Sequence, residues 1–185
     1  MRKLSVFNFV TLNGCYKTID GDTSWHRHGE EEGEFSAKNL QSNNILLFGR
    51  VTYQMMASWW PTPMAIQNMP VVAEGMNNAE KIVFSRTLRK AEWNNTKLIK
   101  DNIVEEIKKL KKLPGNNMTI LGSGSILTQF AEAGLIDEYS LMIDPVVISN
   151  GTPIFDGILK KLDLKLIDTR TFKSGCVLVN YVLGN

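Results

Sequence analysis

The sequence predicts an α/β fold built on a central mixed sheet that ends in an antiparallel C-terminal hairpin. Apolar strand-like runs alternate with segments of helical periodicity, and the runs are apolar throughout, as in strands covered on both faces. The last two strand-like segments are joined by a short polar turn at residues 173–175. With 185 residues, 43% of them hydrophobic, we expect a single domain over residues 1–185.

The individual elements follow from these runs and from the residues that stop them. Strands are expected over Leu4–Leu12, Ile45–Phe48, Lys81–Phe84, Met118–Leu121, Glu138–Ile148, Lys165–Phe172 and Cys176–Leu183. The strand Glu138–Ile148 is expected to be interrupted at Asp144-Pro145. Helices are expected over Glu34–Ser42, Val51–Trp60, Asp101–Leu113 and from the glycine loop after residue 121 through Ala133. In the third helix Ile103, Ile107, Leu110 and Leu113 form an apolar stripe, and Asn102 with Glu105 resembles a capping box. The polar stretch 17–33 and the Met/Asn-rich stretch 61–80 are interpreted as connections.

Composition argues against several classes of function. The 21 basic and 19 acidic residues are spread along the chain, so a nucleic acid or a membrane surface is not expected as the main partner. No apolar run approaches the roughly 18 residues of a membrane span. Cys15 and Cys176 match no zinc or redox motif and read as reduced thiols of a cytoplasmic protein, although a disulfide stays open. His26 and His28 are expected to be solvent-exposed, and no metal site is expected.

Three predicted strands run directly into small, hydroxyl or arginine residues. These junctions are Gly49-Arg50-Val51-Thr52, Ser85-Arg86-Thr87 and Gly122-Ser123-Gly124-Ser125. Ligands of open α/β sheets lie outside the carboxyl ends of the strands, and a strand–glycine–helix junction offers free N–H groups to a phosphate. Each junction alone is also compatible with a tight turn or a surface ion pair. Together they favour a dinucleotide, and the arginines beside Thr52 and Ser85 suit the 2′-phosphate of NADP rather than NAD.

The same residues carry a family resemblance. Gly49–Tyr53, Lys81–Leu88 and Ile120–Ser125 look like the three NADPH-contacting segments of dihydrofolate reductases, while Ala133–Tyr139 and Asp144–Phe155 resemble the reductase domain of the riboflavin-biosynthesis deaminase/reductase. No zinc-deaminase signature is present. The chain is therefore similar to stand-alone dihydrofolate reductase family proteins, which implies a three-layer α/β/α dihydrofolate-reductase-like fold.

The resemblance also implies a cofactor and an activity: hydride transfer from NADPH to a C=N or C=O bond of a small heterocyclic or ribosyl substrate. It assigns the following residues to NADPH, the first three near the nicotinamide: Thr11, Asn13, Gly14, Gly49, Arg50, Val51, Thr52, Ser85, Arg86, Thr87, Gly122, Ser123, Gly124, Ser125, Ile126 and Leu127. A homodimer is expected by analogy.

The substrate side of the resemblance leaves more than one reading. Glu31 and Glu34 are the candidate proton donors, with an ordered water as the alternative source of the proton and a solvent-facing acidic helix start as the alternative role of the glutamates. Four tryptophans, at positions 25, 59, 60 and 93, would line an aromatic pocket or pack in the core or an interface. The rival functions are a true dihydrofolate reductase, a riboflavin-pathway reductase, or a non-catalytic nucleotide-binding or regulatory module that retains the NADPH site.

Overall fold

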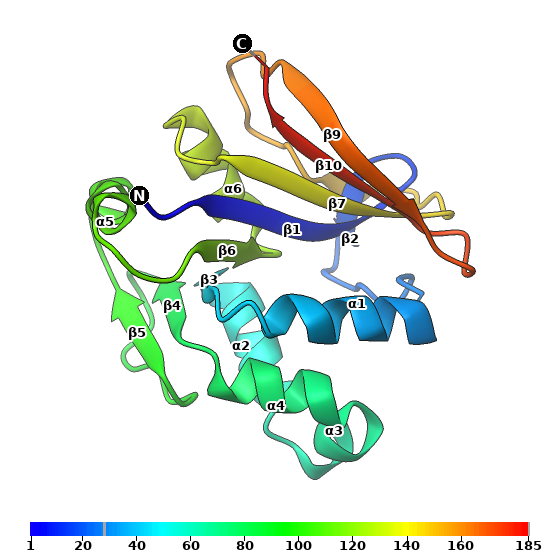
Figure 1. The fold of residues 1–185 in the computed structure, drawn as a ribbon, viewed down its shortest axis with the longest axis horizontal. Coiled ribbons are helices and arrows are strands. Elements are labelled where there is room, and N and C mark those ends of the chain that lie inside the picture. The colour runs from blue at the N-terminus through cyan, green and yellow to red at the C-terminus, as the bar shows by residue number, and fades with distance from the viewer. Residues whose placement is uncertain (28, 185) are drawn as a thin grey trace.

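The computed structural model describes residues 1–27 and 29–184, and within them an eight-stranded sheet forms the centre of the molecule (Figure 1). The strand order is β5-β4-β3-β6-β1-β7-β10-β9. The bounds are β1 Leu4–Thr11, β3 Ile45–Gly49, β4 Lys81–Phe84, β5 Thr96–Ile99, β6 Met118–Leu121, β7 Glu138–Asp144, β9 Leu164–Thr171 and β10 Val177–Leu183.

The sheet is mixed, as predicted, and its antiparallel pairings lie at the C-terminal hairpin. β1 pairs in parallel with β6 and β7, and β3 pairs in parallel with β4 and β6. β10 runs antiparallel to both of its neighbours, β7 and β9. The near-continuous apolar run of β1 is explained by its place in the middle of the sheet, where both faces are covered.

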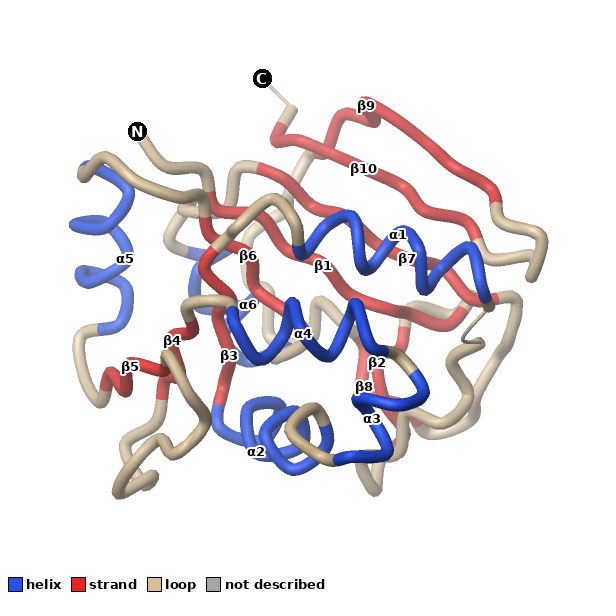
Figure 2. The backbone as a smooth tube through the Cα atoms, turned by 60° about the horizontal axis from the view of Figure 1, so that its bottom comes forward, coloured by secondary structure: helices blue, strands red, loops and turns tan. Residues whose placement is uncertain are grey.

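Helices cover both faces of the sheet, which confirms the three-layer arrangement (Figure 2). Successive side chains of β3 alternate between two cores: Leu47 lies in the cluster with Ile107 and Leu127, and Phe48 in the cluster with Tyr53 and Val72. The first cluster buries α5 (Ile103–Lys112) and α6 (Gly124–Glu132). The second buries α1 (Glu30–Leu40), α2 (Arg50–Trp59) and α4 (Pro70–Asn78), with α3 (Pro63–Asn68) packed on α4.

Two helical predictions are corrected by the structure. The helix predicted from Glu34 begins at Glu30, because the acidic run supplies the negative charge that favours a helix N-terminus. The stretch 61–80, predicted as a connection, contains α3 and α4, which begin at Pro63 and Pro70. Proline is well suited to the first turn of a helix, so these prolines start helices rather than interrupt a loop.

Three further predictions about element ends are wrong. Asn102 has left-handed backbone geometry and no side-chain capping hydrogen bond, so the predicted capping box with Glu105 does not form. Leu113 lies beyond the last turn of α5 and is 52% exposed, so it is not part of the apolar stripe. The strand predicted over Glu138–Ile148 is interrupted at Asp144-Pro145 as expected, but it does not resume beyond Pro145, whose missing N–H cannot continue the ladder.

A small second sheet was not predicted. β2 (Cys15–Thr18) pairs antiparallel with β8 (Gly151–Pro153), and these strands are far apart in the sequence. The pair places the residues that follow the first-strand turn beside the carboxyl end of the main sheet, where the cleft described below opens. No helix in the described part of the chain is long and apolar enough to cross a membrane.

Candidate functional site

A cavity of about 840 Å³ opens at the carboxyl ends of β3 and β4 and beside the loop that follows β6. It brings together most of the residues predicted to bind a cofactor: Gly49, Arg50, Val51, Thr52, Ser85, Arg86, Thr87, Ser123, Gly124, Ser125 and Ile126. The other lining residues are Tyr16, Lys17, Phe84, Gln129 and residues 100–105. The three predicted junctions therefore meet at one cleft, because their parent strands are parallel and adjacent in the sheet.

The glycine loop connects β6 to α6 through two consecutive residues with positive φ. Gly122 has a φ of 58° and Ser123 a φ of 64°. A Cβ on Gly122 would lie 3.1 Å from Cγ2 of Thr52, so glycine permits both the turn and the close approach of α2. The buried Ser123 hydroxyl accepts a hydrogen bond of 2.8 Å from the Gly49 N–H, which ties the ends of β3 and β6 together.

Three helices begin at this cleft, and none of them has a side-chain cap. The N-cap residues of α2, α5 and α6 are Gly49, Asn102 and Ser123, and all three helices lack a capping hydrogen bond from a side chain. Their first-turn residues line the cleft. The N–H groups of a first turn and the positive end of the helix dipole attract anions, so the cleft presents three such ends to one ligand.

Basic side chains on the wall add to this field. Arg50 is exposed and donates from Nη1 to Oε1 of Gln54 at 3.0 Å. Arg86 lies 3.6 Å from Asp101, and this ion pair is weak because both side chains are highly exposed. Lys17 and Lys100 also line the cleft, although neither was predicted. Lys100 follows β5 directly, at the carboxyl end of a strand, where ligands of such sheets bind. It could not be predicted because Thr96–Ile99 is too short and too polar to be recognised as a strand.

Gly122, which forms the turn described above, does not line the cleft, and neither do four further predicted cofactor residues. Thr11 is buried, and its hydroxyl donates to Oδ1 of Asn13 at 2.8 Å. Asn13 in turn donates from Nδ2 to the Ile148 carbonyl at 2.9 Å, and Gly14, with a φ of 77°, completes the turn into β2. Leu127 is fully buried in the core beneath α6. In the structure these four residues therefore make contacts within the protein.

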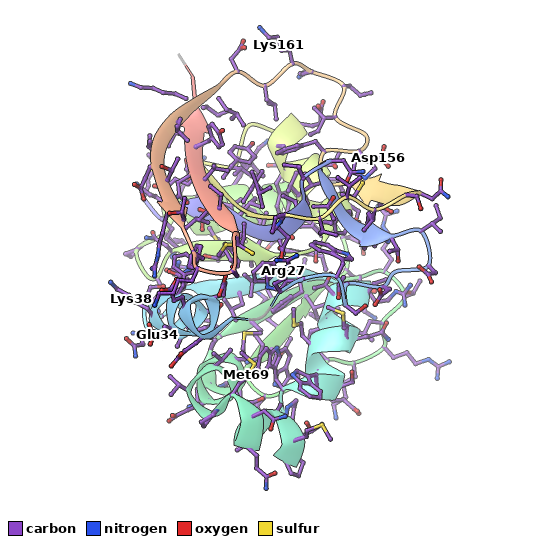
Figure 3. The ribbon with its side chains drawn as sticks, turned by 90° about the vertical axis from the view of Figure 1, so that its right-hand side faces the viewer. Arg27, Glu34, Lys38, Met69, Asp156 and Lys161 are labelled. Atoms are coloured by element: carbon purple, nitrogen blue, oxygen red, sulfur yellow. The ribbon has the colours of Figure 1, made fainter. Side chains whose placement is uncertain are left out.

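The two candidate acids lie outside the cleft. Glu31 accepts a hydrogen bond from the Lys173 backbone N–H at 3.0 Å and pairs with the Lys173 ammonium at 3.2 Å. These contacts, the backbone hydrogen bond first, hold the pKa of Glu31 below its usual range. Glu34 is exposed on the outer side of α1 together with Lys38 (Figure 3). The buried acid of this helix is Glu32, whose carboxylate accepts from the Ser174 hydroxyl.

His26 was predicted to be exposed, and this prediction is wrong. His26 is 7% exposed, and its Nδ1 lies 2.7 Å from Oδ2 of Asp144. The Arg27 N–H and the Cys176 thiol donate to the other oxygen of the same carboxylate. Burial alone would raise the pKa of Asp144, but the hydrogen bonds from His26 and the Arg27 N–H outweigh it and hold the pKa below its ordinary value.

Other expected features have simpler outcomes. His28 lies outside the described residues. Cys15 and Cys176 are both buried and free. Over residues 1–27 and 29–184, no group of three or more His, Cys, Asp and Glu side chains is arranged to hold a metal ion. None of the four tryptophans lines the cleft, and Trp93 packs in the core with its N–H groups bonded to Tyr53 and Asn77.

The sheet order, the reversed C-terminal strand and the ligand-sized cleft at the strand ends belong to an α/β protein with a dihydrofolate-reductase-like fold. Residues 2–178 match the family model described as the RibD C-terminal domain, and the chain belongs to this family. It is 33% identical to the Bacillus subtilis (strain 168) protein YyaP over 172 residues, which are 93% of this chain and 90% of that protein.

Two solved structures show the same fold at low sequence identity. The Thermotoga maritima diaminohydroxyphosphoribosylaminopyrimidine deaminase/5-amino-6-(5-phosphoribosylamino)uracil reductase matches with a TM-score of 0.69 and 16% identity, over 99% of this chain and 57% of that one. The dihydrofolate reductase of Enterococcus faecalis, complexed with NADP(H), matches with a TM-score of 0.68 and 16% identity, over 99% of this chain and 97% of that one.

Proposed function

We propose that this protein is an NADPH-dependent reductase that transfers a hydride to a C=N or C=O bond of a small heterocyclic or ribosyl substrate. The observation that carries the proposal is the convergence of three uncapped helix N-termini with Arg50, Arg86, Lys17 and Lys100 on one cleft. Such a field suits a ligand with several phosphate groups. A deaminase/reductase and an NADP(H)-bound dihydrofolate reductase among the similar structures support the choice of cofactor and reaction class.

The donor set fits this dinucleotide. We assign the pyrophosphate to the loop Gly122-Ser123-Gly124-Ser125, of which Ser123, Gly124 and Ser125 line the cleft, with Gly49, Thr52 and Ile126 beside them. Arg50, Ser85, Arg86 and Thr87 are assigned to the adenosine 2′-phosphate, next to Val51. The cavity volume lies in the range of about 300–1,000 Å³ typical of small-molecule sites. Bound NADPH would supply the hydride, while the protein fixes its geometry and excludes water.

The first-strand turn and Leu127 are assigned less direct roles. Thr11, Asn13 and Gly14 are proposed to hold the turn near the nicotinamide through their own hydrogen bonds. Leu127 would support the glycine loop from the core. A small-molecule substrate, a homodimer and a cytoplasmic location stay predictions.

The source of the proton is proposed to be an ordered water rather than Glu31 or Glu34. A general acid must hold its proton near neutral pH, and the lowered pKa of Glu31 works against this. Glu34 lies exposed on the outer side of α1.

The position of these two glutamates outside the cleft also favours a second candidate function, a non-catalytic nucleotide-binding or regulatory module. NADPH binding without NADPH consumption, across dihydrofolate, the aminouracil ribosyl phosphate and a carbonyl and imine panel, would support the module.

Titration with NADPH and NADH, followed by fluorescence quenching, tests the cofactor assignment. Wild-type protein is expected to bind NADPH more tightly than NADH. Arg50→Ala should weaken NADPH binding about tenfold, the size of one hydrogen bond to a charged group, and should leave NADH binding nearly unchanged. The matched control is Arg89→Ala, which removes an exposed arginine that does not line the cleft. Equal and weak binding of both nucleotides, unaffected by Arg50→Ala, would refute the assignment.

A further inference from the structure

We propose that Tyr16 of β2 belongs to the dinucleotide site and that its hydroxyl donates a hydrogen bond to a pyrophosphate oxygen held at the glycine loop. The inference rests on the proposed function, since it concerns the same cleft. It adds a residue from a strand whose place beside the loop could not be predicted from the sequence.

Tyr16 lies directly against the residue that begins α6. A Cβ built on Gly124 would be 2.8 Å from the phenol oxygen of Tyr16 and 2.9 Å from its Cζ. The end of the ring therefore rests on the Gly124 backbone, and Tyr16 lines the same cleft as Gly49 and Ser123. The pairing of β2 with β8, in which Cys15 is opposite Pro153 and Lys17 opposite Thr152, holds the ring there.

The hydroxyl is left with a hydrogen to donate. The phenol oxygen lies against Gly124, at the first residue of α6. Among residues 1–27 and 29–184, the hydroxyl has no acceptor for its own hydrogen. A phenol hydroxyl can donate one hydrogen bond, so Tyr16 offers a neutral donor to a ligand in the cleft that it lines.

Tyr16 also keeps its proton at neutral pH. Burial and then the charge of Asp156 raise the pKa of Tyr16 above its ordinary value, and the nearby Gly124 N–H opposes this only in part. A protonated phenol is a donor and not a second anion, so it is compatible with a phosphate oxygen. Lys17, whose ammonium lies 5.5 Å from the Tyr16 ring centroid, adds positive charge on the same strand.

Binding of two nucleotides to Tyr16→Phe tests the proposal. Phenylalanine keeps the ring against Gly124 and removes only the hydroxyl. NADPH binding should weaken about tenfold, whereas 2′-AMP, which has the 2′-phosphate without the pyrophosphate, should bind as it does to wild type. The control Tyr181→Phe, on β10 away from the cleft, should bind both ligands normally. Thermal unfolding without ligand verifies that each variant is folded.

The alternative results separate the two proposals. If wild-type protein binds NADPH and Tyr16→Phe binds it equally well or more tightly, the role of the hydroxyl is overturned and the proposed function stands. An equal loss of NADPH and 2′-AMP binding would overturn the assignment to the pyrophosphate. If wild-type protein fails to bind NADPH at all, the proposed function falls, and the role of Tyr16 with it.

Discussion

Gly122 and Ser123 show how single residues shape the cleft. Both have left-handed backbone geometry, which glycine adopts freely and which costs a residue with a Cβ about 1–2 kcal/mol. Ser123 recovers part of this cost because its hydroxyl binds the Gly49 N–H. A larger residue at position 122 would pay the same cost and would in addition bring its Cβ to 3.1 Å from Cγ2 of Thr52.

Gly122→Ala is therefore expected to lower the free energy of unfolding by about 2 kcal/mol and to weaken NADPH binding. Urea unfolding measures the first effect. Gly33→Ala is the matched control, because Gly33 lies inside α1 with no atom within 4 Å of an added Cβ. Alanine there should leave stability unchanged or raise it by up to about 1 kcal/mol. A similar loss in both variants would contradict the explanation.

At the scale of elements, Asp144 at the carboxyl end of β7 binds two residues that precede α1 in the sequence, His26 and Arg27. The buried carboxylate of Asp144 binds His26, the Arg27 N–H and Cys176, and the His26 ring stacks on Phe9 of β1 with centroids 3.7 Å apart. One residue at the last position of a strand thus holds His26 and Arg27, which lie between β2 and α1.

Asp144→Asn should lower the free energy of unfolding by about 3 kcal/mol at pH 7, because a buried charged partner is removed. The native pKa of Asp144 is below its ordinary value, so its contribution is fully present above the unfolded pKa, near pH 4, and is lost as the pH falls through the native pKa. The difference between wild type and variant should accordingly shrink below pH 4 in urea unfolding curves. Asp163→Asn, at an exposed position, should show little difference at any pH. A constant difference down to pH 3 would count against this account.

At the scale of the whole molecule, a ligand in the cleft would join segments that are distant in the sequence. The wall combines β2, the ends of β3 and β4, and the starts of α2, α5 and α6. A ligand that binds only the folded chain stabilises it according to its concentration relative to Kd.

NADPH at one hundred times its Kd should raise the free energy of unfolding by about 2.7 kcal/mol. For a chain of this size, the corresponding rise in Tm is about 5–10 °C. Thermal unfolding with matched concentrations of NADPH and NADH measures the difference, and the rise with NADH should be smaller. An equal shift with both nucleotides would argue against recognition of the 2′-phosphate.

The sequence by itself determined the alternation of strands and helices, the C-terminal hairpin and three of the segments that meet at the cleft. These features depend on local signals: apolar runs of strand length, helical spacing, and glycine or proline at the ends of elements. The junctions after β3, β4 and β6 could be predicted because each buried strand is recognisable alone and parallel strands end at the same edge.

Only the tertiary structure decided which further residues join that edge. The pairing of β2 with β8 brings Tyr16 to Gly124, and the pairing of β5 with β4 brings Lys100 to the cleft. Long-range packing also buries His26 against Asp144. Short or polar segments carry too little local preference to determine their own structure, so contacts with distant parts of the chain decide it.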